Sequence, residues 1–112
     1  MNKLNLGCGN DLRQNYINVD IRREVKPDLI ADLEKSLLSM FRSESVDEII
    51  LKDFLEHLSW RVVEDFLKDC FRVLKKGGSL FIQCPDLEAI AKKVILDPNF
   101  EAFGLSGYKA IS

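Results

Sequence analysis

The sequence NLGCGND, residues Asn5 to Asp11, decides the fold, because two glycines flank one small residue directly after a short apolar run. The preceding segment, Lys3 to Leu6, predicts a β-strand that ends in this turn. Glycine tolerates positive φ angles and lets a ligand approach the backbone closely. Exposed N–H groups in such a turn can bind a polar or anionic group. The stretch therefore predicts a ligand-binding turn at the end of the first strand.

Further along the chain, four short runs rich in β-forming residues predict the remaining strands. They cover residues 16–21, 28–33, 46–54 and 78–85. Helical periodicity of apolar residues fills the intervals and the region after them. The predicted helices cover residues 33–41, 60–74 and 87–96, with Asp32, Ser59 and Asp86 as N-caps. Strands that alternate with helices indicate a mostly parallel sheet covered by helices.

The end of the second predicted helix carries strong signals. Lys75 and Lys76 are expected in its last turn, where the helix dipole favours cations. Gly77 is expected as the left-handed residue that terminates it. The sequence therefore predicts that this helix ends just before the fifth strand.

Length and composition indicate one globular domain. The chain has 112 residues, 46% hydrophobic and 30% charged, with a net charge of −2. We expect a single domain over 1–112, with a ligand-binding core over 1–86 and a helix and tail over 87–112. The acidic balance argues against nucleic-acid binding driven by overall charge. No membrane span or signal peptide is recognisable, so the expected location is cytoplasmic.

The cysteines give no sign of a metal site or a disulfide framework. There are three, Cys8, Cys70 and Cys84, and no C-x-x-C spacing occurs. We expect reduced, buried thiols and no metal. Cys8 stands apart because it lies inside the glycine turn.

Acidic residues close the second and third predicted strands. Asp20 ends the second strand, where a carboxylate can accept hydrogen bonds from both hydroxyls of a ribose. Asp32 follows the third, and its carboxylate can accept from an exocyclic amine such as that of adenine. Because parallel strands present their carboxyl ends at one edge of the sheet, the turn and the two acids indicate a nucleoside site.

Two other interpretations of the turn remain. A dinucleotide fingerprint, G-x-G-x-x-G, requires glycine at position 12, where this chain has Leu12. This departure argues against a nicotinamide-dependent oxidoreductase. A tight turn without any ligand is the other alternative, since G-x-G alone is a weak signal.

The ordered blocks LNLGCG, YINVD, ADLE, SVDEIILKDFLEHL and RVLKKGGSLFIQCPDL together cover most of residues 3–87. In this combination the chain resembles the small bacterial type of class I S-adenosylmethionine-dependent methyltransferases. The resemblance implies a Rossmann-like α/β fold with about five strands in the order 3-2-1-4-5. It also implies that the helix after the first strand is reduced or missing. Only ten residues separate Gly9 from Asp20, which is short for a parallel crossover.

The resemblance implies that S-adenosylmethionine is bound around the glycine turn. Gly7, Cys8 and Gly9 would line the methionine part of the cofactor. Asp20 would hold the ribose hydroxyls, and Ile21 would lie against the adenine.

Further cofactor contacts are implied at the ends of the third and fourth strands. Asp32 and Leu33 would lie at the adenine edge, and Lys52 and Asp53 near the sulfonium. Many relatives carry an acidic residue where this chain has Asn5. An asparagine brings no charge to the cofactor's amino group, so we expect a lower affinity.

The expected function is methyl transfer by direct displacement to an unknown acceptor. The sulfonium is already a strong electrophile, so no short catalytic signature is expected. His57, the single histidine, is expected at the pocket, either as a proton acceptor or as a wall residue without a chemical role. The alternative function is a non-catalytic S-adenosylmethionine-binding module that acts through a partner.

The C-terminal part is shorter than the family pattern. Class I methyltransferases usually carry seven strands, the last two forming an antiparallel edge. Only sixteen residues follow the third predicted helix, so we expect this hairpin to be missing and the acceptor half to be truncated. The fifth strand would then be an apolar edge, covered either by the tail over 100–111 or by a second copy of the chain in a homodimer.

Overall fold

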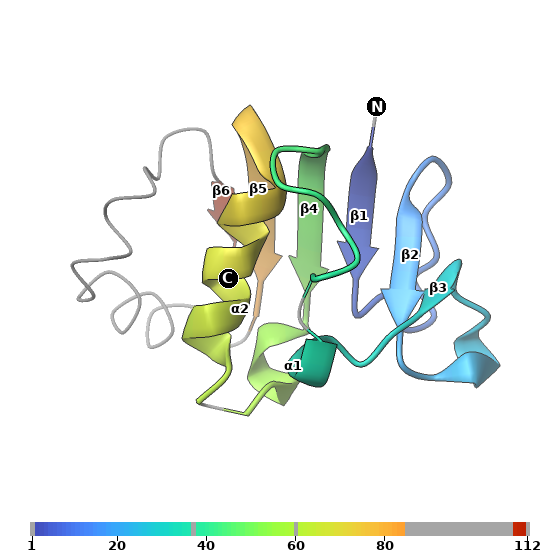
Figure 1. Cartoon of the computed structure of the whole chain (residues 1–112). Coiled ribbons are helices and arrows are strands. Elements are labelled where there is room, and N and C mark those ends of the chain that lie inside the picture. The colour runs from blue at the N-terminus through green and yellow to red at the C-terminus, as the bar shows by residue number, and fades with distance from the viewer. Residues whose placement is uncertain (1, 37, 60, 85–108, 112) are drawn as a thin grey trace.

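The computed structural model describes residues 2–36, 38–59, 61–84 and 109–111. Within them the chain forms a six-stranded sheet in the order β3-β2-β1-β4-β5-β6 (Figure 1). Every neighbouring pair of strands is parallel. The strands are β1 (Lys3–Leu6), β2 (Ile17–Asp20), β3 (Leu29–Ile30), β4 (Val46–Lys52), β5 (Leu74–Gln83) and β6 (Lys109–Ile111). The predicted order 3-2-1-4-5 and the Rossmann-like α/β fold are therefore confirmed.

Two α-helices and two short 3-10 helices connect the strands. They are α1 (Leu33–Ser36), α2 (Val63–Val73) and the 3-10 helices Arg23–Val25 and Leu55–His57. Helix α2 lies along one face of the sheet in front of β5 (Figure 1). Its apolar side buries Phe66, Leu67 and Cys70 in the core cluster formed with Leu4 and Ile49 of the sheet. This burial of apolar surface is the main force that holds helix and sheet together.

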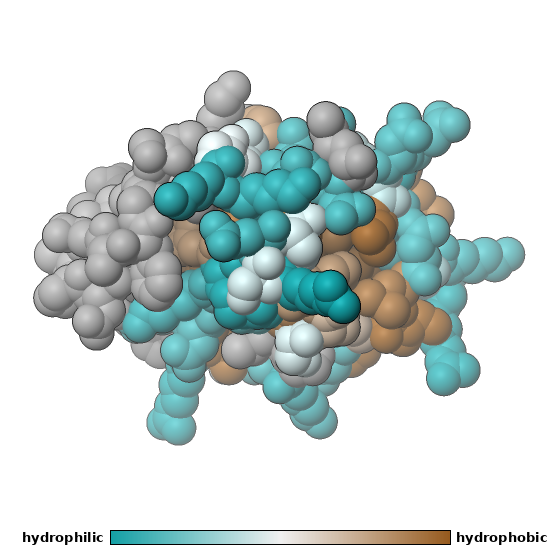
Figure 2. All heavy atoms as spheres, turned by 45° about the horizontal axis from the view of Figure 1, so that its top comes forward, coloured by the Kyte–Doolittle hydropathy of each residue, from teal (hydrophilic) through white to brown (hydrophobic). Residues whose placement is uncertain are grey.

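The surface around the amino ends of the strands is mainly hydrophilic (Figure 2). This is the side from which β1, β2 and β4 start, while their carboxyl ends point toward α1 (Figure 1). No helix among residues 2–36, 38–59 and 61–84 is long and apolar enough to span a membrane.

The predicted helix over 33–41 is wrong beyond Ser36. After α1 the chain turns, and helix α2 holds the following segment through Arg72 and Asp69. The guanidinium of Arg72 donates to the carbonyls of Leu38 at 2.9 Å and Phe41 at 3.1 Å. Asp69 accepts from the N–H of Leu38 at 2.7 Å. These contacts, about thirty residues apart in sequence, satisfy the backbone without a helix.

The predicted end of the second helix is also wrong. Helix α2 spans Val63–Val73, its N-cap is Val62 rather than Ser59, and Leu74 already has extended backbone. Leu74 is buried and pairs with Val46 of β4, so the strand begins earlier than predicted. Lys75, Lys76 and Gly77 consequently lie in β5, where the pairing with β4 is irregular. The positive φ of Gly77, +78°, belongs to this irregularity and not to a helix cap. The predicted helix over 87–96 lies outside the described residues.

Strand β6 pairs with β5 in parallel, with Phe81 opposite Lys109 and Gln83 opposite Ile111. Of the two covers expected for the edge of β5, the tail or a second copy of the chain, the structure shows the tail segment as its neighbour. No antiparallel pair occurs among the six described strands.

Candidate functional site

The glycine turn directly follows β1 and lies against the ring of Phe54, two residues after the end of β4. Gly7 has a φ of +64°, and a Cβ on it would overlap with the ring of Phe54. Gly9 has a φ of +52°, and a Cβ there would come within 3.0 Å of Nη2 of Arg22. Gly7 therefore requires glycine for both conformation and space, and Gly9 requires it for conformation.

Asp20 joins the end of β2 to this turn. Its Oδ2 accepts a hydrogen bond of 2.8 Å from the N–H of Gly9, and its Oδ1 accepts one of 2.9 Å from the N–H of Arg22. The Nε of Arg22 lies 3.4 Å from the same Oδ1. Asp20 is buried, with 7% of its surface exposed. Desolvation favours the protonated form, but these hydrogen bonds outweigh it and hold the pKa of Asp20 below its ordinary value. The carboxylate is therefore ionised at neutral pH.

Two N–H groups of the turn are used inside the protein. The N–H of Cys8 donates to the carbonyl of Val19 at 3.0 Å, and that of Gly9 donates to Asp20. The expectation that these amides are exposed toward a ligand is thus wrong. These two hydrogen bonds join the turn to β2.

A hollow of about 480 Å³ opens at the carboxyl ends of the strands. Its volume falls in the range of small-molecule sites. The residues that line it are Gly7, Asp20, Ile21, Arg22, Ala31, Asp32, Leu33, Glu34, Asp53, Phe54, His57 and Leu58. We call it the main hollow. Ile21 is 57% exposed there and forms an apolar part of the wall.

A second, smaller hollow of about 280 Å³ adjoins the main one. It is lined by Asn5, Gly7, Cys8, Gly9, Asn10, Asp11, Arg22, Lys52 and Asp53. Gly7, Arg22 and Asp53 line both hollows, so they mark the junction between them. Its ionised side chains are two carboxylates, Asp11 and Asp53, and two cations, Arg22 and Lys52.

Asp53 stands at this junction in a strained conformation. It directly follows β4, and its φ is +52°, which is costly for a residue with a side chain. Its N–H donates to the carbonyl of Gln83 at 2.6 Å, and this bond from β5 holds the backbone in place. Strain maintained in this way is common at binding sites.

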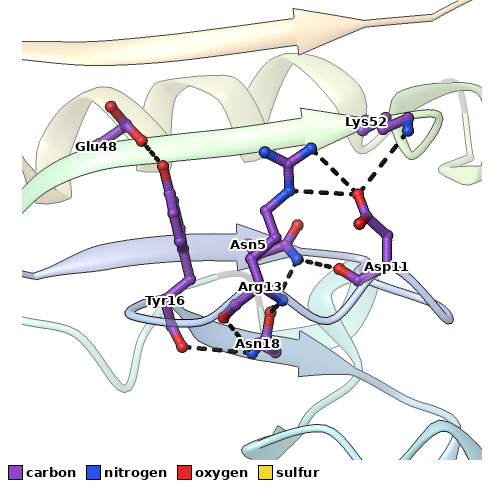
Figure 3. A network of polar contacts seen from close by, with 7 residues as sticks. All are labelled: Asn5, Asp11, Arg13, Tyr16, Asn18, Glu48 and Lys52. Carbon is purple, nitrogen blue, oxygen red and sulfur yellow. Dashed lines mark hydrogen bonds and ion pairs between the residues drawn. The ribbon is translucent and has the colours of Figure 1, made fainter.

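A polar network on the sheet face away from α2 replaces the missing helix between β1 and β2. Asn5 and Asn18, 2% and 6% exposed, lie side by side on the two strands and share a hydrogen bond of 2.9 Å (Figure 3). Asn5 also donates to the carbonyl of Asp11 at 2.7 Å. Asn18 accepts from the N–H of Arg13 at 2.9 Å and donates to its carbonyl at 3.1 Å. The two carboxamides thereby hold the connection between β1 and β2, residues 7–16, which contains no helix.

All predicted site residues line one of the two hollows. The main hollow contains Gly7, Asp20, Ile21, Asp32, Leu33, Asp53 and His57. The second contains Asn5, Gly7, Cys8, Gly9, Lys52 and Asp53. Asp32 also caps α1 as predicted, because its Oδ1 accepts from the N–H of Glu34 at 3.1 Å.

Cys8 faces the second hollow but is a weak nucleophile. Burial, assisted by the nearby negative charge of Asp20, raises the pKa of its thiol. Cys8, Cys70 and Cys84 are all buried and form no disulfide. No group of residues suited to a metal ion occurs within the described ranges.

Phe54, Arg22 and Asn18 are site features that the sequence interpretation missed. Phe54 directly follows Asp53, which was predicted as a site residue, so its place after a strand end could have indicated that it lies at the site. Arg22 was not among the predicted site residues. Asn18 repeats the carboxamide of Asn5 on a neighbouring strand, a pairing that becomes visible only once the register of β1 and β2 is known.

The parallel sheet, the glycine turn after β1 and the carboxylate at the end of β2 define a Rossmann-like α/β protein with its main hollow at the strand carboxyl ends. The methyltransferase domain family matches residues 4–82, more than half of the chain. The chain belongs to this family, whose general activity is methyl transfer. No curated protein and no solved structure matches the chain.

Proposed function

We propose that this chain is an S-adenosylmethionine-dependent methyltransferase domain that binds the nucleoside of its cofactor in the main hollow. The observation that carries the proposal is the ionised carboxylate of Asp20, buried between the glycine turn and the hollow. A carboxylate offers about four acceptor positions, so those left by Gly9 and Arg22 suit the hydroxyls of a ribose.

The rest of the main hollow fits an adenine ring. The exposed Ile21 supplies an apolar surface beside Ala31 and Leu33, and Asp32 supplies an acceptor for the exocyclic amine. The second hollow then suits the amino-acid end of the cofactor. Its carboxylates, Asp11 and Asp53, match an ammonium group.

The cofactor would supply an activated methyl group, and the protein has to align the acceptor and exclude water. Phe54 and Leu58 contribute apolar surface to the main hollow for this purpose. His57 lines the same hollow and is placed to accept a proton from the acceptor if that acceptor carries one. The class of acceptor stays open in this proposal.

Calorimetric titration of the chain with S-adenosylhomocysteine tests the proposal, with NAD as the comparison ligand. We expect saturable 1:1 binding of S-adenosylhomocysteine and none of NAD. The reverse preference would contradict the proposal. Binding without turnover across a panel of acceptors would favour the alternative function, a non-catalytic cofactor-binding module.

A further inference from the structure

We propose that Arg22 recognises the carboxylate at the amino-acid end of the cofactor and so makes the site selective for ligands that carry one. The inference rests on the proposed function and adds a specificity-determining residue to it. It holds for any methyl acceptor.

The position of Arg22 supports this role. It lines both hollows, together with Gly7 and Asp53, and therefore lies where a ligand would pass from one to the other. Its Nη2 lies close to the backbone of Gly9, since a Cβ on that glycine would come within 3.0 Å of it. The end of the side chain is thus held directly over the turn.

The hydrogen bonds of Arg22 leave its two terminal nitrogens, Nη1 and Nη2, available; we call these two atoms the fork of the guanidinium. Its N–H and Nε both face Oδ1 of Asp20, at 2.9 and 3.4 Å. Nη1 and Nη2 have no hydrogen-bond partner among the residues that the structure describes. A guanidinium held by one edge and free at the other matches a carboxylate in a bidentate manner.

The surrounding charges point to a zwitterion. Lys52 is the other cation of the second hollow, but its Nζ lies 3.9 Å from Asp11 and is partly neutralised by it. Asp53 lies at the same junction as Arg22 with the opposite charge. An α-amino acid group carries one charge of each sign, so the junction offers a partner for both.

The test compares two ligands that share the nucleoside but differ in the amino-acid end. S-adenosylhomocysteine carries the carboxylate, and 5′-methylthioadenosine lacks it. Calorimetry is done on the unchanged chain and on Arg22→Ala, Arg22→Lys and Arg23→Ala. Arg23 is the matched control, because it is the neighbouring exposed arginine and lines neither hollow.

We expect Arg22→Ala to weaken S-adenosylhomocysteine binding about tenfold or more and to change 5′-methylthioadenosine binding less than about twofold. Arg22→Lys should fall between, since a lysine keeps the charge and loses the fork. Arg23→Ala should leave both affinities unchanged.

Three results would overturn the inference while leaving the proposed function intact. The first is an equal loss for both ligands, which would mean that Arg22 acts only by bracing Asp20. The second is unchanged or tighter S-adenosylhomocysteine binding. The third is an effect confined to acceptor turnover, which would assign the fork to an anionic acceptor. Failure of the unchanged chain to bind either ligand would instead refute the proposed function.

Discussion

Oδ2 of Asp20 accepts a hydrogen bond of 2.8 Å from the backbone N–H of Gly9, so the end of β2 is joined directly to the turn that follows β1. The connection between β1 and β2 has ten residues and no helix, and this bond fixes its glycine turn against the end of β2. The N–H of Arg22 and this bond from Gly9 together hold the pKa of Asp20 below its ordinary value despite its burial.

Gly7→Ala should destabilise the fold by about 2–4 kcal/mol, because the added Cβ has to overcome both the positive φ and the overlap with Phe54. Gly77→Ala is the matched control: its φ is +78°, but a Cβ there would meet nothing within 4 Å. Urea unfolding should show the larger loss for Gly7→Ala. Equal losses would contradict the close packing of Phe54 on the turn.

Asn5→Asp should destabilise the chain by about 1–3 kcal/mol. The Nδ2 group of Asn5 donates to the carbonyl of Asp11 and to Oδ1 of Asn18, and a carboxylate would face both acceptors without a proton to share. Asn10→Asp adds the same charge on an exposed side chain of the same turn and serves as the control. Thermal or urea unfolding measures both, and a neutral or stabilising Asn5→Asp would contradict the donor role.

Arg72→Ala should lower the free energy of unfolding by about 2–3 kcal/mol. It removes the donor to the carbonyls of Leu38 and Phe41. It also breaks the ion pair with Asp69. Glu64→Ala removes an exposed pair with Lys68 on the same helix and should cost no more than about 0.5 kcal/mol. Urea unfolding compares the two variants. Similar losses would show that the segment after α1 does not depend on Arg72.

The ionisation of Tyr16 should lower the free energy of unfolding at high pH. Desolvation and the hydrogen bond to Glu48 raise the pKa of Tyr16 to about 12. In the unfolded chain a tyrosine titrates near about pH 10, so its stabilising contribution is complete below that pH and is lost as pH rises toward 12. The stability difference between the unchanged chain and Tyr16→Phe, measured by urea unfolding, should shrink over this window. A difference that stays constant from pH 9 to 12 would contradict the partly buried hydrogen bond between Tyr16 and Glu48.

Much of the fold follows from local sequence patterns. The apolar runs that become β1, β4 and β5 are buried on one face of a parallel sheet, and such runs identify strands without tertiary information. Asp20 and Asp53 were also predictable, since the carboxyl ends of the parallel strands β2 and β4 lie at one edge of the sheet.

The missed features depend on contacts between distant segments. Arg72 stops the helical pattern after α1 by binding carbonyls more than thirty residues away, and periodicity carries no trace of this. Leu74 continues a helical pattern but pairs with Val46 instead. The free fork of Arg22 likewise depends on how its side chain lies over the turn.

The most direct test of the central claim is calorimetric titration of S-adenosylhomocysteine into the unchanged chain and into Asp20→Ala. Asp65→Ala is the control, because Asp65 is exposed on α2 and lines neither hollow. Loss of charged hydrogen bonds to the ribose should weaken binding by about 2–3 kcal/mol, roughly 30- to 150-fold, in Asp20→Ala alone. Equal affinities for Asp20→Ala and Asp65→Ala would contradict the assignment of the main hollow to the nucleoside.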